Sequence, residues 1–231
     1  METRSLKNFY LIGTPIGNLN DITLRAIEIL KEIDFLITEN ANRAKKILSF
    51  LKVRKPMLVL NEANFYKKEK FLYEIFSKFK KIGYIVSAGM PGVSDPGNRL
   101  VYFVMNKFPE FKIRVIPGPS ALTAAISLAP FPLNRFLFLG FLPKKKKRRY
   151  YLEKIKKEKL PVILFENPKR IEKLLKELKD ISKKEVWVFR ELTKYYEEVL
   201  RIDLENLKEI PKIKGEVVVI IPGSLDSDNV Q

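Results

Sequence analysis

Polar residues, glycines and prolines gather in several short segments, and each segment follows an apolar run of the strand type. Listed in chain order, they are GTPIGNLND at 13–21, ITENANR at 37–43, SAGMPGVSDPG at 87–97, FENPKR at 165–170 and RELTKYYEE at 190–198. In open α/β sheets, ligands bind beyond the carboxyl ends of the strands, which is where such segments begin. These five segments are therefore candidate ligand-binding loops.

The segment at 87–97 carries three of the ten glycines of the chain. Glycine tolerates positive φ and lets a ligand approach the backbone closely, and proline reduces the entropy that a loop loses on binding. The segment matches neither a Walker phosphate loop nor GxGxxG, which argues against an ordinary nucleotide-phosphate cradle. The structural alternative is a tight connection in which Asp95 makes a local Asx turn.

The composition excludes several kinds of chemistry, because the chain has no cysteine and no histidine. Disulfides, thiol catalysis, His-based triads and zinc sites of the Cys/His type are ruled out. Acid–base chemistry must then fall to Asp, Glu, Lys, Tyr or a group of the substrate. The net charge of +17 favours a polyanionic partner such as nucleic acid or an anionic surface, and the alternative is a lysine-rich composition on solvated helix faces.

The elements that must position these loops alternate along the chain. Strands are expected at 9–13, 35–38, 57–60, 84–87, 113–117, 135–141, 161–166, 185–190 and 215–223. Helices are expected between them, as at 21–33, where Ile22, Ala26, Ile29, Leu30 and Ile33 share one face and Asn20 or Asp21 is the expected cap. This alternation predicts an α/β layered sheet that is mostly parallel, and the second half of the chain repeats the alternation.

The turn-forming PGPS at 117–120 leads into a small-residue helix that Ser120 is suited to cap. We therefore expect two domains, an N-terminal α/β domain at 1–117 and a C-terminal α/β domain at 118–231. Residues 1–13 lack the apolar stretch of a signal peptide, and no apolar run approaches the ~20 residues that span a bilayer. A cytoplasmic protein is expected.

Seven segments in order resemble the tetrapyrrole methylase superfamily and, within it, the branch that methylates small-subunit ribosomal RNA. They are GTPIGNLNDITLRAIEIL, SAGMPGVSDPG, IPGPSALTAAI, FLFLGFLPKKKKRR, LFENPKRIEKLLKEL, RELTKYYEEVLR and GEVVVIIPG, and they run from residue 13 to residue 223. The resemblance implies two α/β domains with S-adenosyl-L-methionine in the cleft between them, and a homodimer. The implied reaction is 2′-O-methylation of a cytidine in the 16S rRNA, either free or in the assembled 30S subunit.

The resemblance also implies site residues. Those expected at the methyl donor are Pro15, Ser87, Ala88, Gly89, Met90, Val93, Asp95, Ser120, Ala121, Phe165, Glu166, Leu192 and Glu216. Those expected at RNA phosphates are Lys144, Lys145, Lys146, Lys147, Arg148 and Arg149, for which the alternative is a solvated loop that aids solubility. Val93 and Phe165 have an alternative role as core residues, since buried apolar side chains usually serve packing.

Two motifs depart from the family pattern. The family commonly has Glu-Asp-Thr-Arg after the second strand, where this chain has ENAN at 39–42, and the loop at 87–97 is one residue shorter and lacks an acidic residue. The remaining catalytic candidates are Glu39, Glu166, Lys169 and Arg170, although Glu39 could cap a helix and the two cations could simply begin one. Three functions stay open: an active rRNA methyltransferase, a diverged paralogue that methylates another RNA position or a small molecule, and a non-catalytic RNA-binding module.

Overall fold

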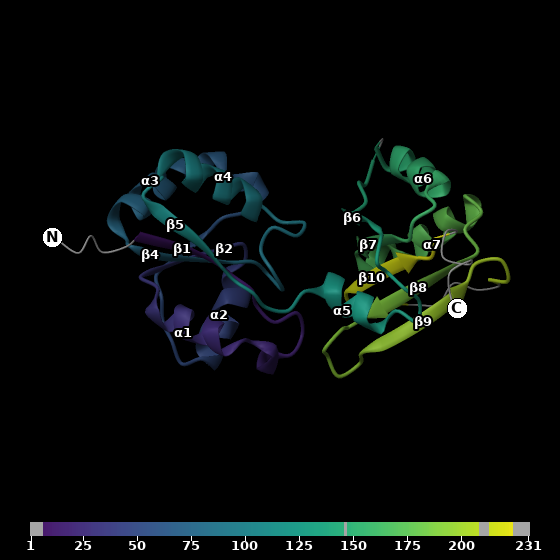
Figure 1. Ribbon diagram of the computed structural model, residues 1–231, viewed down its shortest axis with the longest axis horizontal. Coiled ribbons are helices and arrows are strands. Elements are labelled where there is room, and N and C mark those ends of the chain that lie inside the picture. Colours follow the sequence, from purple (N-terminus) through teal and green to yellow (C-terminus); the bar gives the residue numbers. More distant parts are fainter. Residues whose placement is uncertain (1–6, 146, 208–212, 224–231) are drawn as a thin grey trace. The chain divides into compact units, whose positions relative to one another are not determined.

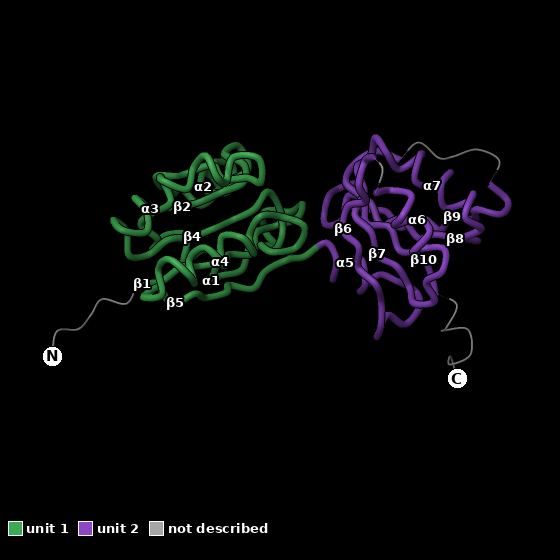
Figure 2. The backbone as a smooth tube through the Cα atoms, turned by 90° about the horizontal axis from the view of Figure 1, so that it is seen from above, with its two compact units in different colours: residues 1–120 green, residues 121–231 purple. Residues whose placement is uncertain are grey.

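The computed structural model describes residues 7–145, 147–207 and 213–223. The chain divides into two compact units, residues 1–120 and 121–231, which Figure 2 distinguishes by colour. The division falls at residue 120, whereas the turn at 117–120 placed the expected boundary after residue 117.

Unit 1 is built on a parallel sheet. Its strands are β1 (Lys7–Ile12), β2 (Phe35–Thr38), β3 (Met57–Val59), β4 (Lys81–Ile85) and β5 (Phe111–Ile116). Their order is β3-β2-β4-β1-β5, and every pairing between neighbours is parallel. The prediction of a parallel α/β sheet is confirmed for this half of the chain.

Helices cover both faces of this sheet. They are α1 (Leu24–Glu32), α2 (Ala41–Phe50), α3 (Glu69–Lys78) and α4 (Gly97–Lys107), with short 3₁₀ turns η1 (Leu19–Asp21), η2 (Glu62–Asn64) and η3 (Tyr66–Lys68). Helices α1 and α2 lie on one face, and α3 and α4 lie on the other (Figure 1). Because side chains alternate along a strand, Phe9 of β1 packs in the cluster with Phe76 of α3, and Ile12 packs in the cluster with Leu30 of α1.

Helix α1 begins later than the sequence suggested. Residues 19–21 form the separate turn η1, so the expected caps Asn20 and Asp21 are wrong. The cap is Thr23, whose side chain accepts a hydrogen bond from the Ala26 amide. The predicted apolar face is confirmed, because Ile22, Ala26, Leu30 and Ile33 are buried and Ile29 is partly buried against them.

Unit 2 has a mixed sheet. Its elements are α5 (Ala121–Leu128), β6 (Leu137–Phe141), α6 (Lys147–Lys157), β7 (Val162–Glu166), η4 (Pro168–Arg170), α7 (Ile171–Asp180), β8 (Glu185–Arg190), β9 (Glu198–Asp203) and β10 (Val217–Ile221). The strand order is β6-β7-β10-β8-β9, with β6 and β7 parallel and the other three pairings antiparallel. The expectation of a mostly parallel sheet is therefore wrong for this half, and β9 was not predicted.

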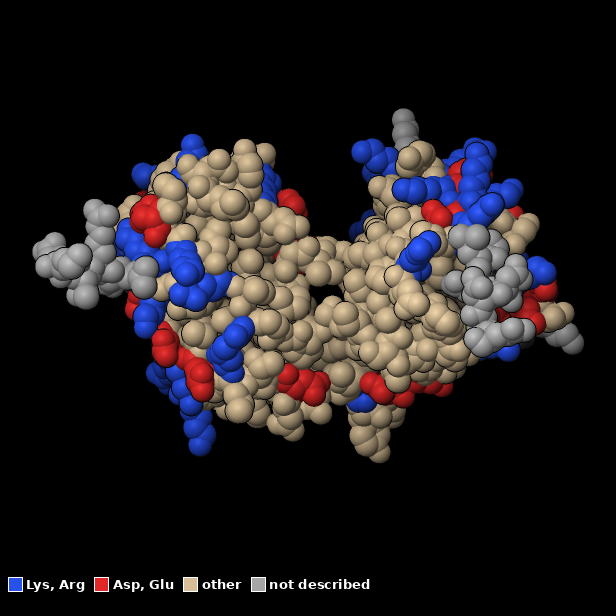
Figure 3. All heavy atoms as spheres, in the orientation of Figure 1, with Lys and Arg blue, Asp and Glu red and all other residues tan. Residues whose placement is uncertain are grey.

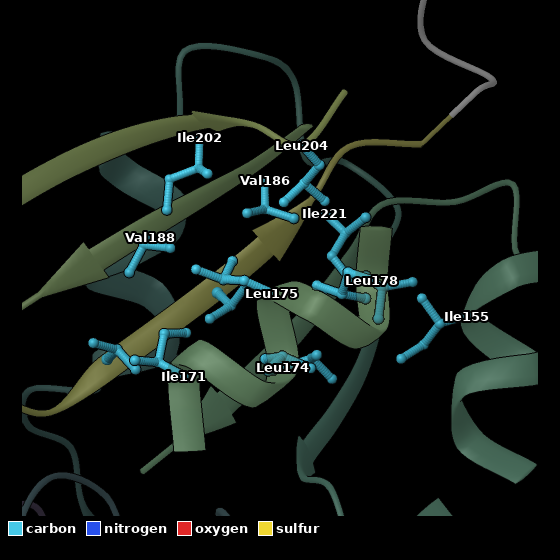
Figure 4. Packing of buried hydrophobic residues seen from close by; sticks show 14 of the residues in the cluster. Ile155, Ile171, Leu174, Leu175, Leu178, Val186, Val188, Ile202, Leu204 and Ile221 are labelled. Atoms are coloured by element: carbon cyan, nitrogen blue, oxygen red, sulfur yellow. The ribbon is translucent and has the colours of Figure 1, made fainter. Parts of the chain in front are cut away.

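The core of unit 2 lies between α7 and the sheet, as Figure 4 shows. The helix buries Ile171, Leu174, Leu175 and Leu178, which recur at the spacing of one helix face. They pack in one cluster with Val186 and Val188 of β8 and with the fully apolar strand β10. Full burial of each such side chain stabilises the fold by ~1.5–3 kcal/mol.

Among the residues that the structure describes, no helix is both long enough and apolar enough to cross a bilayer.

Candidate active site

The loop at 87–97 starts where the connections of the parallel sheet diverge. Strand β4 lies between β2 and β1, and the helices that follow β1 and β2 cover one face of the sheet, whereas α4, which follows β4, covers the other (Figure 1). Such a switch point leaves a crevice at the carboxyl ends of the strands, where α/β proteins bind their ligands. The sequence-predicted loop therefore begins at the position in unit 1 best suited to a ligand.

Glycines hold the loops after β1, β4 and β5 close together. Thr14 and Gly89 exchange backbone hydrogen bonds of 3.0 Å each. Gly89 has φ of +79°, and a Cβ there would lie 3.3 Å from Ile16 Cγ2 and 3.4 Å from the Pro119 carbonyl oxygen. Position 89 therefore requires glycine both for its conformation and for the space around it.

Met90, which follows Gly89 in the β4 loop, also contacts the loops after β1 and β5. The Gly118 amide points at the Met90 sulfur at 3.2 Å, and a Cβ at Gly13 would lie 2.6 Å from that sulfur. Pro15 is buried beside this point, and Ala88 is exposed. Of the expected cofactor residues, the structure thus brings Gly89 and Met90 together with the β1 and β5 loops.

Glu39 fastens the start of the β4 loop to the end of β2. Its Oε2 accepts hydrogen bonds from the Ser87 amide at 3.2 Å and from the Ser87 hydroxyl at 2.8 Å. The alternative that Glu39 caps a helix is wrong, because the cap of α2 is Asn40, whose side chain accepts from the Asn42 and Arg43 amides. The altered motif ENAN therefore supplies both a loop anchor and a helix cap.

Asp95 organises the rest of this loop from within. Its carboxylate accepts hydrogen bonds from the amides of Gly92, Val93 and Gly97, at distances between 2.7 and 2.9 Å. This is the local turn that the sequence offered as the structural alternative for Asp95. The carboxylate therefore shapes the loop, and Val93 is half-buried within it.

Tyr84 is a residue of this region that sequence reasoning missed. The ring lies fully buried beneath the loop, and a Cβ at Gly97 would come within 3.3 Å of Tyr84 Cε1. The hydroxyl finds no hydrogen-bond partner among the described residues. Burial raises the pKa of Tyr84 above its usual range, and the nearby carboxylates of Asp95 and Glu39 raise that pKa further. No signal marks Tyr84 in the sequence, because it stands in an ordinary apolar run.

In unit 2, the cofactor residues expected on the strands lie at the same end of the sheet, where β7 and β8 end and β10 begins. The register pairs Val217 with both Glu166 and Arg190, so the ends of β7 and β8 lie beside the start of β10. Phe165 lies at this end of the sheet, with its ring centroid 5.0 Å from that of Phe138. The others are buried Leu192, which follows β8, and exposed Glu216, whose carboxylate pairs with Lys194 at 3.0 Å.

The side chain of Glu166 is held inside an ion-pair cluster. It is 0% exposed, its Oε1 lies 2.6 Å from Arg170 Nη2, and its Oε2 lies 3.4 Å from Arg148 Nη2. Arg170 also donates from Nη1 to the Leu142 carbonyl oxygen, whereas Lys169 is exposed. The geometry therefore gives Glu166 and Arg170 a structural role, with neither placed as a proton acceptor.

Arg148 is the second cation of this cluster and differs from its basic neighbours. Its side chain is 7% exposed, and its Nε donates to both oxygens of Glu177, at 3.0 and 2.8 Å. Burial alone would lower the pKa of Arg148, but the carboxylates of Glu177 and Glu166 outweigh it and raise that pKa. Arg148 is thus unsuited to a surface phosphate contact, which corrects the expectation for this residue.

The neighbouring basic residues face solvent. Lys144, Lys145, Lys147 and Arg149 are exposed, and Lys146 lies outside the described residues. Figure 3 shows Lys and Arg side chains gathered on the surface over α6. Ser120 and Ala121, at the junction of the two units, are half-buried.

Known proteins match this chain across almost its whole length. The family model of tetrapyrrole (corrin/porphyrin) methylases matches residues 8–208. A ribosomal RNA small subunit methyltransferase I of Thermotoga maritima is 38% identical over 217 residues, covering 92% of this chain and 97% of its own length. The protein of the same name from Coprothermobacter proteolyticus is 41% identical over 215 residues, covering 92% and 96%.

Solved structures with much lower identity share the fold. The methyltransferase CobJ superposes with a TM-score of 0.71 at 15% identity, covering 94% of this chain and 95% of its own. Diphthine synthase superposes with a TM-score of 0.72 at 17% identity, covering 93% and 89%. The family match and the relatives at 38% and 41% identity settle the membership that the loops indicated, and the solved structures show the shared fold. The chain belongs to the tetrapyrrole methylase family, whose methyl donor is S-adenosyl-L-methionine.

Proposed function

We propose that this protein transfers a methyl group from S-adenosyl-L-methionine to a ribose 2′-hydroxyl of a cytidine in the small-subunit rRNA. The observation that carries the proposal is the identity of 38% and 41% to two proteins named for that RNA, over 92% of this chain in each case. The basic net charge of +17 supports an RNA substrate, since phosphate contacts supply much of the affinity for nucleic acids.

The residues of unit 1 fit the methyl donor. S-adenosyl-L-methionine supplies an electrophilic methyl group on a sulfonium cation. A glycine-rich loop at the switch point that lacks the pattern of a phosphate cradle suits such a ligand better than a nucleotide phosphate. The residues proposed to hold it in this unit are Pro15, Ser87, Ala88, Gly89, Met90, Val93 and Ser120.

Unit 2 is proposed to contribute residues from the end of its sheet where β7 and β8 end and β10 begins, together with Ala121 from the start of α5. Phe165 and Leu192 offer apolar surface there. Glu216 offers its backbone groups and an exposed carboxylate that is paired with Lys194. Glu166 is proposed to stabilise this end of the sheet through its ion pairs with Arg148 and Arg170, rather than to bind the ligand through its carboxylate.

Glu39 is the proposed positioning residue on the β2 side. Its carboxylate fixes the amide and the hydroxyl of Ser87, and thereby the start of the loop that begins at the switch point. Holding reacting groups in place supplies a large share of many rate enhancements. Lys169 remains a proposed cation at the reaction site, because it is exposed and follows β7.

The partners and the location follow from the proposed reaction. The substrate is the 16S rRNA, as free RNA or in the 30S subunit, and ribosomal subunits place the enzyme in the cytoplasm. A homodimer is proposed on the family resemblance. Sedimentation of the purified protein tests it, since a monomer at all concentrations contradicts it.

The activity test uses labelled S-adenosyl-L-methionine with small subunits and, separately, with naked 16S rRNA that lacks the modification. The proposed function predicts label on one ribose 2′-oxygen of a cytidine. Label on a base, or on another RNA, contradicts the proposed function and supports the diverged paralogue that the altered motifs ENAN and SAGMP suggest. No transfer and no calorimetric binding of the methyl donor by folded protein contradicts both and supports a non-catalytic RNA-binding module.

A cofactor-site variant sharpens this test. Gly89→Val places a branched side chain at φ of +79° among Ile16 and the Pro119 carbonyl, so affinity for S-adenosyl-L-methionine should fall by at least tenfold. The control is Ala63→Leu, an exposed position on η2 of the same unit. Calorimetry compares the two, and wild-type affinity in Gly89→Val contradicts the placement of this loop at the cofactor.

A further inference from the structure

Helix α6 presents an exposed stripe that combines cations with an aromatic ring. Lys147, Tyr150, Lys154 and Lys157 recur at i, i+3, i+7 and i+10, and all four are exposed. Residues at this spacing lie along one side of a helix. The buried residues Arg148 and Ile155 fall on a different side, which faces into unit 2.

The ring of Tyr150 packs against a neighbouring ring that is partly buried. Tyr150 is 66% exposed, and its ring meets that of Tyr151 edge-on at 5.5 Å between centroids. Tyr151 is partly buried and packs against the core of the unit. The start of α6 is held by Arg148, through its ion pairs with Glu177 and Glu166. The exposed face of the Tyr150 ring therefore belongs to a helix that is held in place, which reduces the conformational entropy lost on binding.

The charge around the ring is almost entirely positive. The exposed residues of α6 include Lys147, Arg149, Lys154, Lys156 and Lys157 against the single carboxylate of Glu153. The surface over α6 is correspondingly rich in Lys and Arg (Figure 3). A single exposed tyrosine needs no explanation, but an aromatic face within a cationic stripe is the arrangement with which proteins bind single-stranded nucleic acid.

A pair of exposed rings elsewhere in unit 2 does not share this setting. Tyr195 and Tyr196 lie at the turn between β8 and β9, next to Glu197 and Glu198, and both of these carboxylates are exposed. Residues 190–198 hold three carboxylates against the two cations Arg190 and Lys194, so the net charge of the turn is −1 and does not attract phosphate groups. The charge setting thus favours α6 over this turn.

We propose that Tyr150 stacks on an unpaired base of the RNA substrate while Lys147, Lys154 and Lys157 contact the flanking phosphates. The occupant is a single-stranded segment, because the bases of a duplex are stacked on each other and unavailable to a side chain. This inference rests on the proposed RNA substrate and adds a recognition mode. The stripe would hold an unpaired region, while the reaction takes place elsewhere on the chain.

The test compares binding of wild type and Tyr150→Ala to a fluorescent single-stranded RNA of about 12 nucleotides and to its duplex. Loss of one stacking contact predicts binding to the single strand that is about 5- to 140-fold weaker. The slope of log K against log salt should stay unchanged, because no cation is removed. Tyr150→Phe keeps the ring and should bind as wild type does.

The matched control is Tyr102→Ala, which removes a tyrosine that is 71% exposed on α4 of unit 1 and should leave RNA binding unchanged. Single-strand affinity of Tyr150→Ala equal to wild type overturns the proposal. An equal loss for the duplex also overturns it, since stacking on an unpaired base is then not the cause. Wild type that binds neither RNA overturns it as well.

A spectroscopic measurement gives an independent answer. Trp187 is the sole tryptophan of the chain, so Tyr150→Trp in a Trp187→Phe background reports on position 150 alone. Stacking predicts quenched fluorescence at saturating single-stranded RNA, and an unchanged spectrum contradicts the proposal. Methyl transfer is measured separately. If it is absent while Tyr150 still governs RNA binding, the proposed function fails and this inference stands.

Discussion

The hydroxyl of Tyr84 is a buried polar group of unit 1 that lacks a hydrogen-bond partner within the described part of the chain. Its oxygen has no hydrogen-bond partner among the described residues, and the ring is completely buried under the β4 loop. A buried polar group without a partner costs ~1–3 kcal/mol. Tyr84→Phe removes that group and keeps the ring, so the free energy of unfolding should rise by about 1 kcal/mol. Urea denaturation of both proteins near neutral pH measures the difference.

The pH dependence of the same pair of proteins tests the raised pKa of Tyr84. The unfolded chain loses this proton near the usual pKa of about 10, whereas the folded protein retains it. Wild type therefore loses stability as the pH rises above about 10, and Tyr84→Phe is spared this loss. The stability gap between the two should widen with pH, and a gap that narrows contradicts the assignment.

Glu39 and Ser87 should act as a coupled pair on the β4 loop. Each single change to alanine breaks the 2.8 Å hydrogen bond between the carboxylate and the hydroxyl. A double-mutant cycle on the free energy of unfolding should then show a coupling of about 1 kcal/mol. Thr23→Ala is the control, because it removes the cap of α1, whose hydrogen bond from the Ala26 amide involves neither Glu39 nor Ser87, and it should add independently to either change. Strict additivity of Glu39→Ala and Ser87→Ala contradicts the predicted anchor.

At the scale of elements, the ion-pair cluster joins α6, β7 and α7. Arg148→Met removes the cation that lies between Glu177 and Glu166 and leaves both carboxylates short of a partner inside the fold. Breaking a buried pair in this way costs about 3–5 kcal/mol. The control is Arg149→Met at the exposed neighbouring position, where a change within about 0.5 kcal/mol is expected. Urea denaturation compares the two, and equal stabilities contradict a structural role for Arg148.

The elements also show what their sequences do and do not encode. The alternation of apolar runs with helical spacings predicted the parallel sheet of unit 1, because a helix between two strands allows the chain to cross over into a parallel strand. The same runs in unit 2 say nothing of strand direction, so the antiparallel placement of β10 was missed. Strand β9 was missed because it is mostly exposed, with charged residues such as Arg201 between its apolar positions.

The candidate site was predictable only where a pattern marks it. The glycines and prolines of 87–97 pointed to the loop at the switch point. The partner of Ser87, by contrast, is Glu39, 48 residues away in the sequence, and only the fold brings them together. The burial of Arg148 within a run of exposed cations had no sequence signal either, since helical phase alone decides which cation of PKKKKRR turns inward.

At the scale of the whole molecule, each unit closes its own core, and the positive charge is spread over both. The apolar clusters of unit 1 and that of unit 2 are composed of residues from their own unit. The net charge of +17 therefore attracts RNA toward the molecule as a whole, while the affinity depends on which cations lie at phosphates.

The salt dependence of RNA binding separates these two contributions. Changing Lys144, Lys145, Lys147 and Arg149 to alanine removes four exposed charges before and within the first turn of α6 and lowers the net charge from +17 to +13. Each lost phosphate contact should reduce the slope of log K against log salt by about 0.7, or by up to about 3 in total. Fluorescence titrations over a range of salt concentrations measure this slope.

The matched control changes Lys45, Lys46, Arg54 and Lys70, which are exposed cations of unit 1, and reaches the same net charge. Long-range attraction then weakens equally in both proteins, so a difference between their slopes reports only the local phosphate contacts. A steep slope retained by the control and lost by the α6 variant is the predicted result. Equal slopes would mean that the RNA is held by the overall charge, and that the basic segment at the start of α6 serves only solubility.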